Sequence, residues 1–129
     1  MSSSKKNVIR GLHIQTKKPQ AKVITVVSGK IMDVAVDLRK NSKTFGKHFK
    51  IILSEKNSKS LLIPSGFAHG FLTLSTQATV VYNVSSVYEP KSDTGIRYDS
   101  FGFKMPISKP IVSDRDNSFE SFKNFNSPF

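Results

Sequence analysis

The feature that most constrains the fold is a succession of short apolar runs separated by turn residues. The runs are rich in Val, Ile and Leu, and none has a convincing helical period. Turn residues recur roughly every eight to twelve positions, which is typical of an all-β sandwich or barrel. The strands are expected at Lys22 to Val27, Lys30 to Leu38, His48 to Leu53, Ser60 to Ile63, Phe71 to Leu74 and Thr79 to Val84.

The first two of these runs are predicted to form a hairpin. They are separated by Ser28 and Gly29, a typical turn pair. In the second run, strict alternation places one set of apolar side chains on a single face of the strand, namely Met32, Val34, Val36 and Leu38. The charged residues of the same stretch are interpreted as strand-end ion pairs rather than as catalytic groups: Asp33, Asp37 and Arg39.

A chain of 129 residues is expected to form a single domain, because two halves of this length would bury too little surface to fold unaided. The tail differs from the rest, since Phe119, Phe122 and Phe125 recur every three residues in an Asn- and Ser-rich segment. We expect an arm from about residue 117, with a short helix or an extended course. Its rings are expected to cover the barrel or a subunit contact, because buried aromatic rings mostly serve packing.

The composition excludes several kinds of chemistry. Cysteine is absent, so disulfides, thiolate catalysis, iron–sulfur clusters and Cys-based zinc sites are ruled out. The apolar runs are well below the ~20 residues of a membrane-spanning helix, and no apolar stretch follows Lys5 and Lys6 as in a signal peptide. No membrane association and a cytoplasmic location are therefore expected.

The net charge of +11 favours an anionic partner. The lysines are scattered and no basic cluster contains interleaved aromatic residues, so specific nucleic-acid binding is not expected. A small phosphorylated ligand needs only two or three of these cations. Nonspecific binding of polyanions is the alternative use of the charge.

The string Pro64-Ser65-Gly66-Phe67-Ala68-His69 resembles the second motif of the cupins, P-x-G-x-x-H. The first cupin motif supplies H-x-H, a Glu and a Gly, where this chain has His13, Gln15, Lys22 and Gly29. An amide and an ammonium group replace the imidazole and carboxylate that a divalent ion would require. The sequence therefore predicts a cupin-type jelly-roll barrel without a metal ion.

Longer blocks are similar to the dTDP-4-dehydrorhamnose 3,5-epimerase family. They lie in order along the chain between about Lys5 and Asp116: residues 7–15, 20–48, 62–75 and 111–116. The resemblance implies a homodimeric enzyme that epimerises a dTDP-4-keto-6-deoxyhexose without a cofactor, in deoxysugar and polysaccharide biosynthesis.

By the same resemblance, His13 abstracts the proton beside the 4-keto group, Asp116 orients and supports His13, Lys22 steadies the enolate oxygen and Tyr82 returns a proton on the opposite face. The resemblance also implies a group of substrate-binding residues near the sugar and diphosphate, namely Arg10, Gln15 and His69. His48 matches no catalytic position and is expected at the surface.

Elementary chemistry supports these assignments. Histidine is the side chain best suited to act as a base near neutral pH. A fixed cation in a water-poor barrel stabilises the negative charge that develops on an enolate oxygen. Inversion at a carbon then needs a donor on the other face, and a phenol with an ordinary pKa of ~10 is neutral and able to give a proton.

Two departures from the family pattern bear on function. The family has a portion before the Asn7 to Gly11 block that helps to hold the nucleotide, and this chain begins almost at that block. An alternative function is therefore a nucleotide-sugar-binding cupin with impaired catalysis. The family commonly has Lys after the catalytic Tyr, where this chain has Asn83, so inversion of one carbon or of two is left open.

Overall fold

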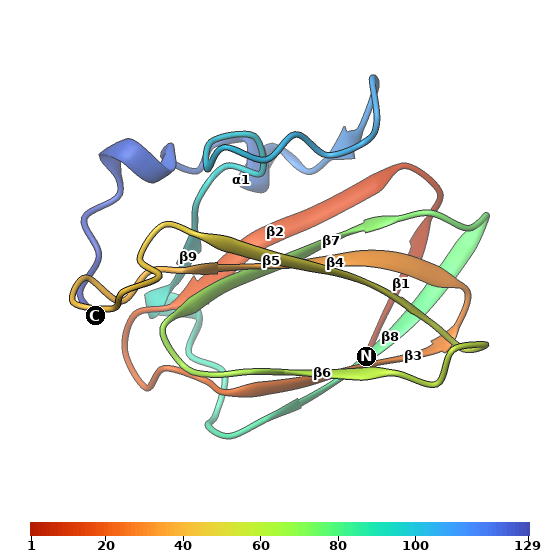
Figure 1. Cartoon of the computed structure of the whole chain (residues 1–129), viewed down its shortest axis with the longest axis horizontal. Coiled ribbons are helices and arrows are strands. Elements are labelled where there is room, and N and C mark those ends of the chain that lie inside the picture. Colours follow the sequence, from red (N-terminus) through yellow and green to blue (C-terminus); the bar gives the residue numbers. More distant parts are fainter.

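Two β-sheets face each other in the computed structural model, which describes residues 1–129 (Figure 1). The strands of the first sheet are, in spatial order, β1 (Ser2–Lys5), β8 (Gln77–Val84), β3 (Lys22–Ser28) and β6 (Ser60–Ile63). Those of the second are β10 (Ile111–Val112), β2 (Val8–Gln15), β7 (Phe67–Thr73), β4 (Lys30–Asp37) and β5 (His48–Ser54), and β9 (Asp93–Gly95) also pairs with β2. This arrangement confirms the predicted all-β, cupin-type jelly roll.

Helices are short and lie in the C-terminal third of the chain. They are η1 (Pro90–Ser92), α1 (Asp114–Asn117) and η2 (Phe122–Asn124). None of them has the length and apolar character needed to cross a bilayer. All six predicted strands form, although β7 begins at Phe67, directly after the turn at Gly66, rather than at Phe71.

The predicted hairpin between β3 and β4 is wrong. β3 pairs with β8 and β6 in one sheet, whereas β4 pairs with β5 and β7 in the other. Gly29 has φ +82°, and a Cβ atom there would collide with the carbonyl oxygen of Gln77. The turn therefore carries the chain from one sheet to the other, because the local turn signal does not specify which strands will pair.

The space between the sheets holds one part of the core. Side chains from both sheets meet there, and the fully buried ones include Ile24, Val80, Ile31, Leu53 and Phe71. Both faces of β4 are buried, since Ile31 and Ala35 point to this inner core whereas Val34 and Val36 point outward. The predicted common face of Val34, Val36 and Leu38 is confirmed, with Met32 packed against it.

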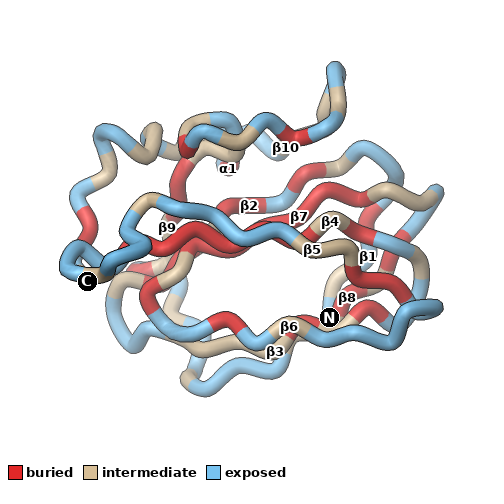
Figure 2. The backbone as a smooth tube through the Cα atoms, in the orientation of Figure 1, coloured by how far each residue is buried: buried red, intermediate tan, exposed pale blue.

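The outer face of the second sheet is covered by the C-terminal segment (Figures 1 and 2). Phe101 and Met105 are buried against Ile9, Leu12 and Leu72 of this face. Phenylalanines of the tail pack on the same cluster: Phe122, Phe125 and Phe129. Of the three rings expected to cover the barrel or a subunit contact, Phe122 and Phe125 therefore cover the barrel.

The charged residues of β4 differ in their surroundings. Asp37 ends the strand and forms an ion pair with Arg39, with 3.0 Å between Oδ1 and Nε, as predicted. Asp33, which was also predicted to form a strand-end ion pair, lies in the middle of β4, is fully buried and contacts His69. The prediction failed because a charge within a strand buried on both faces has no route to solvent. His48 is exposed, as expected, and stacks on Phe103.

Candidate active site

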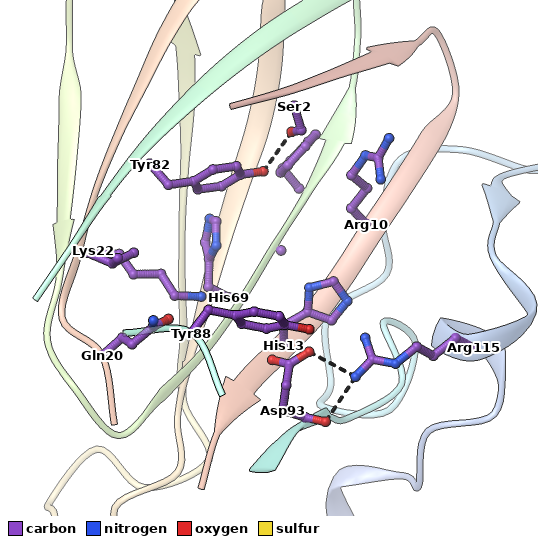
Figure 3. Close-up of a pocket in the computed structure, with 13 residues that line it drawn as sticks. Ser2, Arg10, His13, Gln20, Lys22, His69, Tyr82, Tyr88, Asp93 and Arg115 are labelled. Carbon is purple, nitrogen blue, oxygen red and sulfur yellow. Dashed lines mark hydrogen bonds and ion pairs between the residues drawn. The ribbon is translucent and has the colours of Figure 1, made fainter. Parts of the chain in front are cut away.

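A cavity of about 420 Å³ opens between the two sheets. Five of the seven predicted site residues line it: Arg10, His13, Lys22, His69 and Tyr82 (Figure 3). Arg10 and His13 come from β2 of the second sheet, whereas Lys22 and Tyr82 come from β3 and β8 of the first. The side chains predicted to act as base and acid therefore approach the cavity from opposing walls.

An irregularity in β2 brings Arg10 and His13 to the same cavity. Residues three apart on a regular strand point to opposite faces. The pairing of β2 with β7 shifts register between Arg10 and His13, where Gly11 has φ +106°. A Cβ atom on Gly11 would lie 2.6 Å from the carbonyl oxygen of His69, so the close approach of the strands requires glycine.

His13 is held by Asp116. Nε2 of His13 lies 2.8 Å from Oδ1 of Asp116, and the backbone N–H of Gly11 donates to Oδ2 at 2.9 Å. Burial opposes ionisation of Asp116, but the hydrogen bonds from His13 and Gly11 outweigh it and lower its pKa. Because an ionised carboxylate only accepts, Nε2 of His13 carries a hydrogen and Nδ1 is left to accept a proton.

The position of Asp116 follows from the start of α1. The Ser113 hydroxyl caps the helix by accepting a hydrogen bond from the backbone N–H of Asp116. The chain then continues to Phe119, whose ring packs edge-on against His13 with 5.7 Å between ring centroids. The His13 ring is thus held from two sides by one C-terminal segment, which contributes Asp116 and Phe119.

Lys22 brings a cation into the cavity from the first sheet. Burial lowers the pKa of its ammonium group, and the negative charges of Asp93 and Asp33 oppose this effect. A desolvated ammonium group beside fixed carboxylates is suited to stabilise a developing oxyanion, because little water competes for that anion.

Tyr82 lies on the same wall as Lys22. Its hydroxyl is 2.9 Å from Oγ of Ser2, on the edge strand β1 (Figure 3). Burial raises the pKa of the Tyr82 phenol, the Ser2 hydrogen bond and the Arg10 charge act in the opposite direction, and the net pKa is higher than usual. Tyr82 is therefore protonated at neutral pH and can donate.

A second His–Asp pair lies in the cavity wall. Nε2 of His69 is 2.7 Å from Oδ1 of Asp33, and both side chains are at most 4% exposed. The second oxygen of Asp33 has no hydrogen-bond partner. The negative charge of Asp33 opposes the lowering of the Lys22 pKa by burial, and it adds to the raising of the Tyr82 pKa.

Two arginines supply positive charge at the mouth of the cavity. Arg10 is oriented by Ser4, with 2.7 Å between Nε and Oγ. Arg115 of α1 donates to both the carboxylate and the carbonyl oxygen of Asp93 at 2.9 Å (Figure 3). Two guanidinium groups at one opening are suited to bind phosphate oxygens.

Gln15 does not line the cavity, contrary to the prediction. Its amide donates to the carbonyl oxygens of Lys18 and Val87 and accepts from the backbone N–H of Glu89. Alternation does direct Gln15 to the same side as His13. The segment after β8, however, folds over the end of β2 and forms hydrogen bonds with the Gln15 amide. Gln15 instead fastens the loop that carries Tyr88 to the cavity.

Several lining residues have no counterpart in the sequence prediction. They lie at the chain start, in loops or in the segment after β8: Ser2, Gln20, Tyr88, Asp93 and Arg115. No local motif marks these positions. Asp33 did carry a signal, because a carboxylate between apolar neighbours in a buried strand is costly unless it is paired.

The donor set of the cavity does not favour a divalent ion. No group of three or more His, Asp or Glu side chains is arranged to hold a metal. Arg10 and Lys22 would repel a cation, and one nitrogen of each histidine is already bonded to a carboxylate. A reaction without a metal or other cofactor remains a prediction.

Comparison with known proteins places this cavity in context. The profile of the dTDP-4-dehydrorhamnose 3,5-epimerase family matches residues 1–124. The enzyme of that name from Methanothermobacter thermautotrophicus is 42% identical over 127 residues, which cover 95% of this chain and 69% of the relative. The one from Salmonella typhimurium is 44% identical over 119 residues, covering 89% and 65%. The chain thus spans about two thirds of the length of these relatives.

Solved structures of similar fold are named as epimerases of the same kind. A dTDP-6-deoxy-D-glucose-3,5-epimerase from Legionella pneumophila, in complex with dTDP-4-keto-L-rhamnose, superposes with a TM-score of 0.93 at 37% identity, covering 97% of this chain and 68% of that one. The 3'-monoepimerase ChmJ from Streptomyces bikiniensis, in complex with dTDP-quinovose, gives 0.87 at 30% identity, covering 93% and 63%. With the profile match over nearly its whole length, the chain belongs to the dTDP-4-dehydrorhamnose 3,5-epimerase family.

Proposed function

We propose that the protein epimerises a dTDP-4-keto-6-deoxyhexose at carbon 3, or at carbons 3 and 5, without a cofactor. The observation that carries the proposal is the placement of His13, paired with Asp116, across one cavity from the protonated phenol of Tyr82. Removal of a proton from one face of a carbon and its return to the other inverts that carbon. Opposing sheets supply the two groups.

In the first step, Nδ1 of His13 takes the proton from a carbon next to the ketone. The electron pair of the broken C–H bond moves into the carbonyl group and gives an enolate. Asp116 stabilises the imidazolium that forms, because its charge lies 2.8 Å from Nε2. The ammonium group of Lys22 stabilises the enolate oxygen in a cavity with little competing water.

In the second step, the Tyr82 hydroxyl gives its proton to the opposite face of the same carbon. A new C–H bond forms, the ketone is restored, and a phenolate is left on Tyr82. Exchange of protons with water returns both groups to their starting states. Atoms and electrons balance without an oxidant or reductant.

Binding of the dTDP portion is assigned to the cavity mouth. Arg10 and Arg115 lie there with their guanidinium groups oriented by Ser4 and Asp93. A bidentate guanidinium group suits the oxygens of a diphosphate. His69, held by Asp33, faces the sugar from the second sheet.

The test is incorporation of solvent deuterium into a dTDP-4-keto-6-deoxyhexose, followed by NMR. The wild-type chain is expected to exchange hydrogen at carbon 3, or at carbons 3 and 5. His13→Asn is expected to lose exchange by a factor of about 100 or more, since a general base contributes on that order. His48→Asn, at the exposed start of β5, is the matched control and should retain exchange.

Three results distinguish the possibilities. Exchange that depends on His13 supports the epimerase. Binding of dTDP by the wild-type chain without any exchange indicates a nucleotide-sugar-binding protein with impaired catalysis. Binding that ignores the nucleotide base and weakens steeply with salt indicates nonspecific attraction of polyanions.

A homodimer is part of the proposal. β1 is the edge of the first sheet, and one side of its backbone has no strand partner. An unpaired edge favours pairing with another strand. Light scattering of the purified protein is expected to give twice the 14.4 kDa of one chain, and a monomer would remove this part of the proposal.

A further inference from the structure

The side chains of the edge strand β1 alternate, so that Ser2 and Ser4 lie on its inner side whereas Ser3 and Lys5 are exposed. Ser2 contacts the hydroxyl of Tyr82, and Ser4 accepts a hydrogen bond from Arg10. Ser3, between them, bonds to Thr79 on the exposed side, as alternation along a strand requires. One short strand thus contacts both the phenol on β8 and the guanidinium group on β2.

The position of Ser2 is fixed by the sheet as well as by its side chain. Ser2 pairs with Val80, and the pairing continues through Ser4 opposite Ala78. Arg10 clamps the strand from the other sheet, through the Ser4 hydroxyl and the Ser3 carbonyl oxygen. Ser2 is therefore held beside Tyr82 by contacts that do not involve the phenol.

We propose that Ser2 is a positioning residue that orients the Tyr82 hydroxyl, an inference that rests on the proposed function. Ser2 donates a hydrogen bond to the phenolate formed when Tyr82 gives up its proton. Ser2 is the one hydrogen-bond partner of the Tyr82 oxygen in the structure. A hydrogen bond to a phenolate is stronger than one to a phenol, because the acceptor is charged. The contact therefore strengthens as the proton leaves.

The other groups that face Tyr82 act only through their charge or packing. Arg10 of β2 lies on one side, where its charge favours the phenolate, and Asp33 of β4 disfavours it. The His69 ring packs edge-on, with 6.3 Å between ring centroids, and Lys22 lines the same wall. Removal of the Ser2 hydroxyl leaves all four in place.

The first experiment needs no substrate. Fluorotyrosine replaces the three tyrosines of the full chain, so that the phenols titrate at a lower pH than those of tyrosine. Fluorine NMR then follows the titration of each fluorotyrosine. Tyr82→Phe assigns the signal. Ser2→Ala is expected to raise the pKa of residue 82, whereas Ser3→Ala and the hydroxyl-retaining Ser2→Thr should leave it near the wild-type value.

An unchanged titration of residue 82 in Ser2→Ala would overturn the proposal, whatever the activity. If Ser2→Ala does not fold, Ser2→Cys provides the comparison, because a thiol is a weak donor of similar size. This arm is independent of catalysis, so absence of deuterium exchange in the wild type would refute the proposed function without deciding the role of Ser2.

The second experiment measures kinetics on the epimerisation substrate. Ser2→Ala is expected to lower kcat by about tenfold with little change in KM, since the hydrogen bond matters most once charge develops on the phenol. Ser3→Ala should match the wild type, and Ser2→Thr should recover most of kcat. A rise in KM with kcat unchanged would show that Ser2 serves substrate binding and would overturn the proposal.

Discussion

The backbone N–H of Gly11 donates a 2.9 Å hydrogen bond to Oδ2 of Asp116, the carboxylate whose other oxygen holds His13. Strand β2 therefore contributes both the proposed base, His13, and a backbone donor that supports the carboxylate bonded to it. The carboxylate itself comes from the C-terminal cover. The orientation of the His13 ring thus depends on how the C-terminal segment packs on the second sheet.

Asp116→Asn is expected to reduce kcat/KM by about 100-fold or more, because an amide no longer stabilises the imidazolium and no longer fixes the tautomer of His13. Asp114→Asn, an exposed change on the same helix, should leave kcat/KM unchanged. Steady-state kinetics with the dTDP-4-keto sugar measure both. Equal activity of the two variants would contradict the role given to Asp116.

Gly11→Ala is expected to unfold more easily than Gly102→Ala by about 2 kcal/mol, because only the first substitution forces an atom into neighbouring backbone. Both glycines have positive φ, so the conformational strain is common to the two variants. A Cβ on Gly102 meets nothing within 4 Å, whereas one on Gly11 lies 2.6 Å from the His69 carbonyl oxygen. Urea unfolding measures the difference. Equal losses of stability would show that the strand approach tolerates a methyl group.

Asp33→Asn is expected to lower the pKa of Lys22 further, because the negative charge that favours its ammonium form is removed while burial remains. NMR titration of the lysine side chains provides the measurement, with Lys22→Met to identify the signal. Asp99→Asn, an exposed aspartate outside the cavity lining, serves as the control. An unchanged pKa of Lys22 in Asp33→Asn would mean that the charge of Asp33 does not stabilise the ammonium form of Lys22.

Asp37→Asn is expected to lower the free energy of unfolding by about 2 kcal/mol or more at pH 7, because a buried carboxylate with several donors is replaced. Burial opposes ionisation, but hydrogen bonds from Arg39, Ser42 and Thr44 lower the pKa of Asp37 well below its ordinary value of 3.8. A carboxyl group with a lowered folded-state pKa contributes its stability above the unfolded-state pKa and loses it as the pH falls.

The deficit of Asp37→Asn should therefore be smaller at pH 3 than at pH 7. Urea unfolding of wild type and variant at both pH values measures this change. Asp114→Asn, at an exposed position, is expected to show little deficit at either pH. A deficit of the same size at pH 3 and pH 7 would show that the ionised form of Asp37 is not the stabilising one.

The sequence by itself determined six of the strands and five of the residues that line the cavity. Alternation with a period of two is a local property, so Val34, Val36 and Leu38 could be placed on one face without knowledge of any partner strand. The resemblance to the family likewise pointed to His13, Lys22, His69 and Tyr82, because the ability of a side chain to act as a base, a cation or an acid follows from its residue type.

Only the tertiary structure decided which strands pair and what each polar group contacts. The Ser28-Gly29 turn joins two sheets instead of forming a hairpin, and Gln15 is used to hold a loop. Ser2 lies 80 residues from Tyr82, and Asp33 lies 36 residues from His69. Contacts over such separations arise from the closure of two sheets around a common core, and no local pattern of residues encodes that closure.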